Sequence, residues 1–121
     1  MTNFVDGLGV TDRTADDGTA HLVLDATGDH LNEAGTVHGG VLATLVDTAM
    51  GQAVRSRTGE DDVPATSQLT VTYLRPGKPG RLEVTGRVSK QGEHLTVCEA
   101  DVEQDGRTLV HAVATFAVLH T

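Results

Sequence analysis

Aromatic side chains are nearly missing from this 121-residue sequence, which contains Phe4, Tyr73 and Phe116 and no tryptophan. The hydrophobic core must therefore be built mainly from valine, leucine and alanine, which each bury a small apolar area. A small aliphatic core is a reason to expect further stabilisation from association with other copies of the chain. The length predicts one domain covering residues 1–121.

Three further absences limit the possible partners. Cys98 is the single cysteine, so no internal disulfide can form and a reducing cytoplasm is the expected location. No apolar run is long enough to span a bilayer, and the first ten residues lack the basic and apolar regions of an export signal. The net charge is −8, and only two lysines are present. Such an acidic surface repels phosphates, so we expect neither nucleic acid nor a membrane as partner.

The motifs of several enzyme classes are also missing. The sequence contains no H-E-x-x-H pair, no second cysteine for a zinc cluster, no G-x-S-x-G elbow and no phosphate-binding loop. We therefore expect no metal and no cofactor. His94, His111 and His120 lie in or near predicted strands and are interpreted as packing or surface residues.

The apolar pattern predicts one strand, one helix and four further strands. The first strand covers residues 20–25, a loop covers residues 26–37, and the helix covers residues 38–56. Residues 1–19 are mixed, with one short helical turn at residues 4–8. The four later strands are predicted at residues 65–74, 81–90, 94–103 and 108–119. The Asp-Gly pair at 105–106 predicts a tight hairpin, because it tolerates positive φ.

The predicted helix carries a single charge, Asp47, within residues 39–54. A surface helix would carry a charged face, so this one is expected to be buried on most sides. One apolar helix followed by a four-stranded antiparallel meander predicts an α+β hotdog fold, in which the sheet curls around the helix. Two copies could then pair to cover the open sheet edges and the outer face.

The junction His38-Gly39-Gly40 is a candidate oxyanion site. The first amides of a helix have no internal acceptor, and the positive end of the helix dipole lies there. Glycine allows a ligand to approach the backbone closely, and such amides can stabilise a carbonyl oxygen that gains negative charge. A glycine pair that only permits a tight turn is the alternative, and the spacing alone favours that structural role.

Asp47 needs a partner or a cavity, because an unpaired carboxylate among apolar residues is costly. It could be satisfied by Thr44 or Thr48, or it could line a cleft as a general base or nucleophile. The pattern alone leaves both interpretations open. Gly39 lies eight residues earlier, about 12 Å away along a helix. If both residues act on one small substrate, Asp47 must come from a neighbouring subunit.

The segment from Asn32 to Asp47 resembles the PaaI-type (phenylacetate-degradation) branch of the hotdog-fold acyl-CoA thioesterases. That family has an asparagine, then His-Gly-Gly six residues later, then an aspartate nine residues after the histidine. The spacing of Asn32, His38-Gly39-Gly40 and Asp47 matches this pattern. The resemblance continues through residues 66–76 and 90–92, and it covers about residues 20–119.

The resemblance implies that a homodimer or a tetramer of two dimers hydrolyses an acyl- or aryl-acyl-CoA without a cofactor. It implies that the N–H of Gly39 binds the thioester oxygen and that Gly40 belongs to the same substrate-binding turn. His38 and Asn32 would shape this end of the site, with Asn32 contacting the thioester or the attacking water. Phenylacetyl-type groups are the acyl groups that the family leads one to expect.

The resemblance also implies that Asp47 of the other subunit is the catalytic carboxylate. Thr66 or its neighbour Ser67 falls where the family has a hydroxyl that helps to hold the water. Tyr73 belongs to the matching stretch that follows.

Three cations, Arg75, Lys78 and Lys90, are candidates for contact with the phosphates of CoA. Each could equally be an ordinary solvated residue. Two other functions remain as alternatives: a non-catalytic module that binds or senses acyl-CoA, and a hotdog hydratase/dehydratase. The second would need a catalytic Asp–His pair, for which Asp29-His30 is a poor match.

Overall fold

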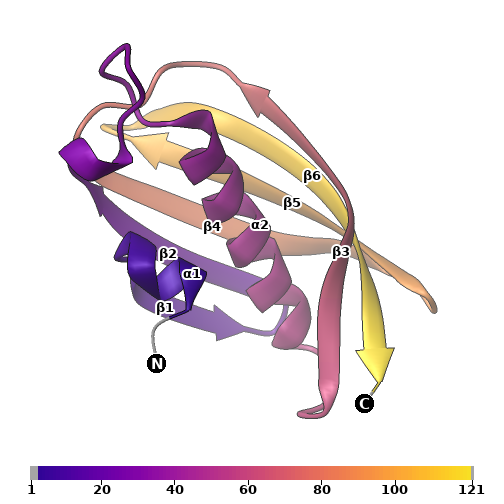
Figure 1. Ribbon diagram of the computed structural model, residues 1–121. Coiled ribbons are helices and arrows are strands. Elements are labelled where there is room, and N and C mark those ends of the chain that lie inside the picture. The colour runs from indigo at the N-terminus through magenta and orange to yellow at the C-terminus, as the bar shows by residue number, and fades with distance from the viewer. Residues whose placement is uncertain (1–2, 121) are drawn as a thin grey trace.

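Residues 3–120 are described by a computed structural model, in which one six-stranded antiparallel sheet curves around one long helix (Figure 1). The predicted α+β hotdog fold is confirmed. The elements in chain order are α1 Phe4–Leu8, β1 Thr11–Asp16, β2 Thr19–Ala26, the 3-10 turn η1 Gly28–His30, α2 Gly39–Arg55, β3 Asp62–Tyr73, β4 Gly80–Gln91, β5 Leu95–Gln104 and β6 Arg107–His120.

The strands lie in the order β1-β2-β4-β5-β6-β3, so the predicted four-strand meander is wrong. Of the four strands in that meander, only β4, β5 and β6 follow one another as hairpins, whereas β3 pairs with β6 from Asp62 opposite His120 to Tyr73 opposite Val110. The glycine- and proline-rich loop of residues 74–79 carries the chain from β3 to β4. As a result, β3 forms one open edge of the sheet and β1 forms the other.

Strand β1 was not expected, because residues 1–19 show no apolar alternation. All of its residues are exposed, and it is held mainly by pairing with β2. The turn between the two strands is made by Asp17 and Gly18, which both have positive φ. The short helical turn predicted near the N-terminus is confirmed as α1.

Helix α2 is fully buried on the side that faces the sheet, and of its residues only Gly40 and Arg55 are exposed. Thr44, Asp47 and Thr48 lie on the other side and are half-buried. The helix crosses β4 at Gly86, where a Cβ atom would lie 2.6 Å from the carbonyl carbon of Ala49. The side chains buried against the sheet are Leu42, Leu45, Val46, Ala49, Met50, Ala53 and Val54.

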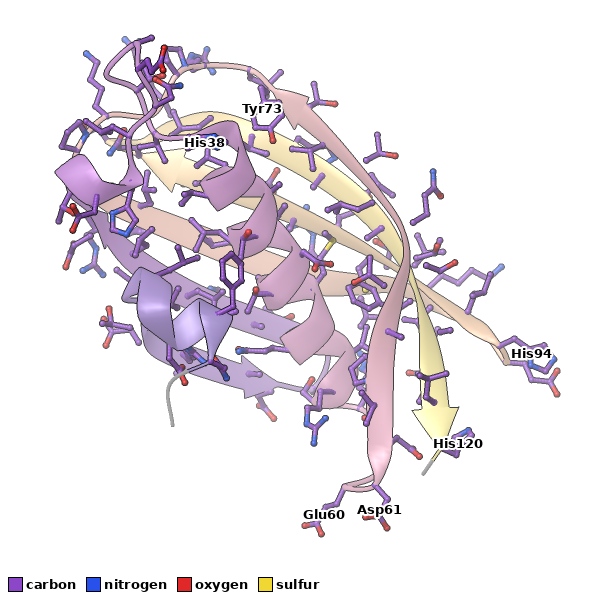
Figure 2. All side chains as sticks on the ribbon, viewed as in Figure 1. His38, Glu60, Asp61, Tyr73, His94 and His120 are labelled. Carbon is purple, nitrogen blue, oxygen red and sulfur yellow. The ribbon has the colours of Figure 1, made fainter. Side chains whose placement is uncertain are left out.

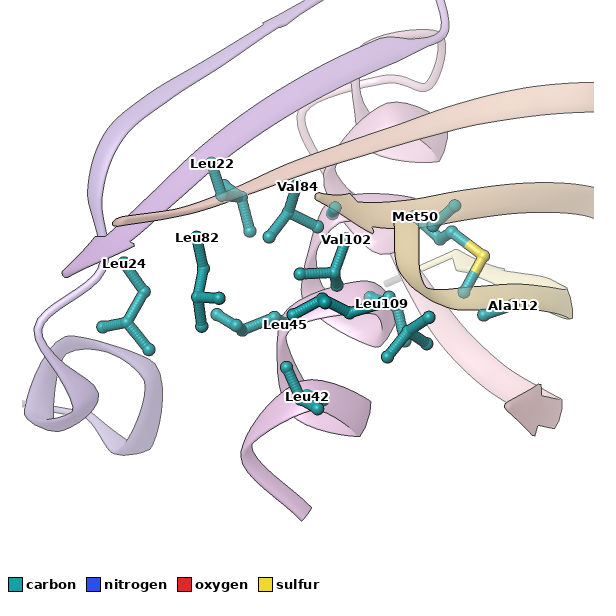
Figure 3. Packing of buried hydrophobic residues seen from close by; sticks show 14 of the residues in the cluster. Leu22, Leu24, Leu42, Leu45, Met50, Leu82, Val84, Val102, Leu109 and Ala112 are labelled. Atoms are coloured by element: carbon teal, nitrogen blue, oxygen red, sulfur yellow. The ribbon is translucent and has the colours of Figure 1, made fainter. Parts of the chain in front are cut away.

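The core lies between this side of α2 and the concave face of the sheet. Leu45 meets Leu82 and Val102 from the middle strands (Figure 3). The core is mainly aliphatic, as the composition predicts, and its other members are Met50, Cys98 and Phe116. None of the helices in residues 3–120 combines the length and the hydropathy that crossing a membrane requires.

Candidate active site

The N-terminal end of α2 leaves one backbone donor free. The side chain of His38 caps the helix, because its Nδ1 accepts the N–H of Gly40 at 2.9 Å. The carbonyl of His38 accepts the N–H groups of Val41 and Leu42 at 2.9 and 3.2 Å. Within residues 3–120, the N–H of Gly39 is therefore the only amide of the first turn without an acceptor. It lies at the positive end of the helix dipole, where an oxyanion would be stabilised.

A cavity of about 300 Å³ opens beside this amide, and Gly39, Asn32, Tyr73 and Arg75 contribute to its lining. The hydroxyl of Tyr73 donates to the carbonyl oxygen of Gly39 at 2.7 Å. Figure 2 shows Tyr73 and His38 at the same end of α2. Tyr73 was not predicted as a site residue. Its position at the end of a predicted strand, in a chain with few aromatic residues, could have indicated a role in the site.

Asn32 lies in this cavity, but its side chain organises its own loop. Its Oδ1 accepts the N–H groups of Ala34 and Thr36 at 3.0 and 3.2 Å, and its Nδ2 donates to the Thr36 hydroxyl at 2.9 Å. This network holds the loop that leads into His38. Contact between Asn32 and a substrate remains a prediction.

Asp47 finds its partner on the sheet and not on its own helix. The hydroxyl of Thr66 on β3 donates to Oδ1 of Asp47 at 2.7 Å. The hydroxyl of Thr44 donates instead to the carbonyl of Gly40 at 2.8 Å. The two predicted hydroxyl candidates, Thr66 and Ser67, are both exposed, and Thr66 is the one that donates to the carboxylate.

A β-bulge at Ser67 makes this contact possible. Thr66 pairs with Phe116 and Gln68 pairs with Thr115, so Ser67 is an extra residue in β3. In a regular strand, Thr66 and Leu69 would point to opposite faces, because they are three residues apart. The extra residue allows both side chains to face α2.

A second cavity, of about 260 Å³, lies beside Asp47. It shares no lining residue with the cavity beside Gly39, and the two residues are about 12 Å apart along the helix. Within one chain, the free amide and the carboxylate are therefore separate, as their spacing predicts. The lining residues of this second cavity are Phe4, Val5, Ala43, Thr44, Asp47, Thr48 and Leu69.

Cations line a third and larger cavity, of about 670 Å³. Arg75, Lys78 and Arg107 all contribute to it, and Arg75 also lines the cavity beside Gly39. The structure thus brings Arg75 and Lys78 together. Lys90 lies near the other end of β4, roughly 33 Å from Gly80 at the usual rise per residue. The sequence did not indicate that Arg107 would join this cavity, because only the tertiary structure places the β5–β6 hairpin beside loop 74–79.

Gln104 is a second residue that the sequence did not indicate. Its side chain is buried, donates to the carbonyl of Lys78 at 2.8 Å and accepts the N–H of Lys78 at 3.0 Å. This two-point contact fixes the loop that carries the cations against the end of β5.

The Asp29-His30 pair is not free for acid–base chemistry. His30 is buried, its Nδ1 accepts the N–H of Thr27 at 2.9 Å, and its Nε2 donates to the carbonyl of Leu8 at 2.7 Å. Both ring nitrogens are therefore occupied by backbone groups. The geometry that a hydratase would need is not provided by this pair.

The other candidate side chains lie away from α2's N-terminal end or are unreactive. His94 and His120 lie far from His38 (Figure 2), and His111 contacts Asp101 at 2.7 Å. Burial raises the pKa of the Cys98 thiol to about 11, so at neutral pH it is protonated and a poor nucleophile. Among residues 3–120, no cluster of three His, Cys, Asp or Glu side chains could hold a metal ion.

Comparison of the sequence with known proteins identifies the family to which the chain belongs. The sequence model described as the thioesterase superfamily matches residues 34–111. Human acyl-coenzyme A thioesterase 13 is 37% identical over 76 residues, which is 61% of this chain and 53% of that protein. The chain spans about half to two thirds of the length of the curated relatives it matches.

Two solved structures are similar along most of the chain. A phenylacetic acid degradation-related protein of Ralstonia eutropha JMP134 has a TM-score of 0.86 and 27% identity, covering 93% of this chain and 87% of that one. The BH2602 protein of Bacillus halodurans, solved with CoA, has a TM-score of 0.78 and 34% identity, covering 82% of this chain and 66% of that one.

Proposed function

Because the chain belongs to the thioesterase superfamily, as a PaaI-type hotdog member, we propose that it hydrolyses acyl-CoA thioesters to a free acid and CoA. One observation carries the proposal: a free amide, Gly39, and a half-buried carboxylate, Asp47, lie on the same apolar helix. A thioester needs only these two groups, an oxyanion donor and a carboxylate, and neither a metal nor a redox cofactor.

In the proposed reaction, the N–H of Gly39 donates to the thioester oxygen as it gains negative charge. Asp47 either deprotonates a water molecule that attacks the carbonyl carbon or attacks that carbon itself. The C–S bond then breaks, and the CoA sulfur leaves as the thiol. Its proton comes from Asp47 on the water route and from solvent on the nucleophilic route. On the nucleophilic route, a water molecule then hydrolyses the acyl–Asp47 anhydride to the free acid and restores the carboxylate. The Thr66 hydroxyl orients Asp47, while His38 and Asn32 hold the turn that presents Gly39.

We further propose that each site uses Gly39 from one copy and Asp47 from another. The separation of about 12 Å along α2 supports this division. The half-buried side of α2 and the open edge of β3 offer surfaces that a second copy could cover. Two such dimers would form the homotetramer that we favour.

For CoA, we propose that Arg75 and Lys78 attract the phosphates, together with Arg107 from the same cavity. These cations are concentrated at one end of a molecule whose net charge is −8. The CoA bound to the Bacillus halodurans protein supports a CoA ligand. Lys90, at the other end of β4, would have to act from a neighbouring copy. The similarity to the Ralstonia eutropha protein supports an aryl-acetyl group among the substrates.

The direct test is Asp47→Asn, which keeps the side-chain volume and removes the carboxylate. Released thiol is measured across short, medium, long and aryl acyl-CoAs for the wild type and the variant. We expect kcat to fall by at least about 10²-fold, with a much smaller change in KM.

Two outcomes would contradict the proposal. A folded Asp47→Asn protein that hydrolyses its substrate at nearly the normal rate would remove Asp47 from the chemistry. A wild type that binds acyl-CoA tightly and releases no thiol from any substrate would favour the alternative of a binding or sensing module.

A further inference from the structure

Helix α1 lies on the same face of the sheet as α2 (Figure 1). Two of its side chains, Phe4 and Val5, line the cavity beside Asp47. Phe4 is 71% exposed, the highest exposure among the exposed large hydrophobic residues of the described part of the chain, residues 3–120. The helix therefore presents an aromatic ring to a cavity without using it to fill the core.

Polar contacts hold α1 in place. The side chain of Asn3 caps the helix by accepting the N–H of Asp6 at 2.9 Å, and Arg13 contacts the Asp6 carboxylate at 2.7 Å. The buried ring of His30 donates to the carbonyl of Leu8 at 2.7 Å. No residue of α1 is fully buried, and Val5 and Leu8 are half-buried, so these polar contacts add to a small apolar contribution.

The cavity combines apolar walls with one charge. Phe4 and Val5 from α1, Ala43 from α2 and Leu69 from β3 supply apolar surface, and Asp47 is the only charged residue in the lining. This arrangement suits an acyl group whose carbonyl carbon lies near a carboxylate and whose chain lies against apolar side chains.

We propose that α1 forms a wall of the acyl-binding cavity and that Phe4 sets the preference of the enzyme for large apolar acyl groups. The inference rests on the proposed thioesterase function, because it takes Asp47 as the carboxylate that faces the thioester. It assigns a specificity role to a segment outside the motif from Asn32 to Asp47.

A binding experiment tests this role without any turnover. Calorimetry compares CoA with hexyl-CoA, a thioether that cannot be hydrolysed, for the wild type and Phe4→Ala. Each fully buried methylene contributes about fourfold to affinity. We expect hexyl-CoA to bind wild type at least about tenfold more tightly than CoA, and Phe4→Ala to reduce this ratio at least about fivefold. The affinity for CoA itself should not change.

A matched control is Leu119→Ala, which removes a large side chain that is 51% exposed on β6 and does not line this cavity. It should leave the affinity ratio unchanged. A ratio that Phe4→Ala leaves intact, or a wild type that binds CoA and hexyl-CoA equally, would overturn the inference. If, in addition, Phe4→Ala sediments as a smaller oligomer than the wild type, the result would show that Phe4 contacts the partner copy instead.

A hydrolysis assay separates this inference from the proposed function. In Phe4→Ala, kcat/KM should fall about tenfold for hexanoyl- and phenylacetyl-CoA and stay within about twofold for acetyl-CoA. A uniform fall across the three substrates would contradict a role in specificity. Absence of hydrolysis by wild type would reject the proposed function, while the calorimetric ratio would still decide the contact of Phe4 with an alkyl chain.

Discussion

The two cavities along α2 differ in the polar groups that they offer. At the N-terminal end, the reactive group is a backbone N–H, and apolar side chains share the lining with several polar groups: the Tyr73 hydroxyl, the Asn32 loop and the Arg75 guanidinium. In the middle of the helix, the reactive group is the Asp47 carboxylate, and the surroundings are mainly apolar. One end is therefore suited to a developing negative charge and to phosphates, and the other to an alkyl or aryl group.

This difference explains why the proposed mechanism needs two copies of the chain. An oxyanion donor and a base must both lie within hydrogen-bonding reach of one reacting group. The regular helix keeps the two groups about 12 Å apart, and no side-chain rotation removes that distance. A second copy that brings its Asp47 cavity to the Gly39 cavity of the first would complete the site.

The largest expected fall in kcat comes from removing the free N–H of Gly39 while Asp47 is left unchanged. Proline lacks the N–H, is well accepted at the first position of a helix and requires the extended backbone that His38 already has. We expect Gly39→Pro to lower kcat by about 10²- to 10³-fold, the usual loss for one oxyanion-hole donor. Circular dichroism and thermal unfolding should report an intact fold.

Gly39→Ala is the matched control, because it retains the N–H and adds a Cβ that would lie 3.3 Å from the Tyr73 oxygen. Its kcat should fall much less than that of Gly39→Pro. If the two variants lose activity equally, crowding against Tyr73 explains the loss of kcat, and the Gly39 N–H does not contribute to catalysis.

A smaller effect is expected at the carboxylate end when its hydroxyl partner is removed. Thr66→Val deletes the donor to Asp47 and keeps the side-chain shape. Since Asp47 itself remains, we expect kcat to fall about tenfold, well short of the loss in Asp47→Asn. Thr70→Val on the same strand makes no contact with Asp47 and should keep normal turnover. A Thr66→Val enzyme with wild-type kcat would show that the hydrogen bond only stabilises the free protein.

The smallest effect should appear at the cations. Arg75→Gln combined with Lys78→Gln should raise KM for acyl-CoA several-fold and leave a truncated thioester without the nucleotide unaffected. The increase should shrink at high salt, where charges are screened. Arg57→Gln, which breaks only an exposed pair with Asp17, serves as control. Equal effects on both substrates would count against phosphate contact, and Lys90→Gln on its own tests the contribution from the far end of β4.

The sequence predicted the helices and strands whose own residues show a clear apolar pattern. The helix was placed within one residue at each end, because the run is mainly apolar with a single charge and a loop containing Gly28 and Gly35 precedes it. Asp47 was identifiable as the single charge in that run. Strand β1 was not predicted, because all of its residues are exposed and its sequence therefore shows no apolar alternation.

The contacts that complete the cavities depend on residues far apart in the chain. Thr66 reaches Asp47 only because β3 pairs with β6 and because Ser67 forms a bulge, and neither follows from alternation of apolar residues. Phe4 and Arg107 join their cavities through the packing of α1 and of the β5–β6 hairpin. Resemblance to a family identified the motif residues, and tertiary structure was needed for these neighbours.

Mixing of two inactive variants tests the shared site most directly. Asp47→Asn and Gly39→Pro proteins are co-expressed with different tags or refolded together, and hydrolysis is compared with that of each variant alone. With random pairing, half of the dimers are mixed and one of their two sites is intact, so activity should recover to about one quarter of wild type. The double variant mixed with either single variant should recover none. If the mixture of the two single variants stays inactive although mixed dimers are isolated through both tags, Gly39 and Asp47 do not act across two copies.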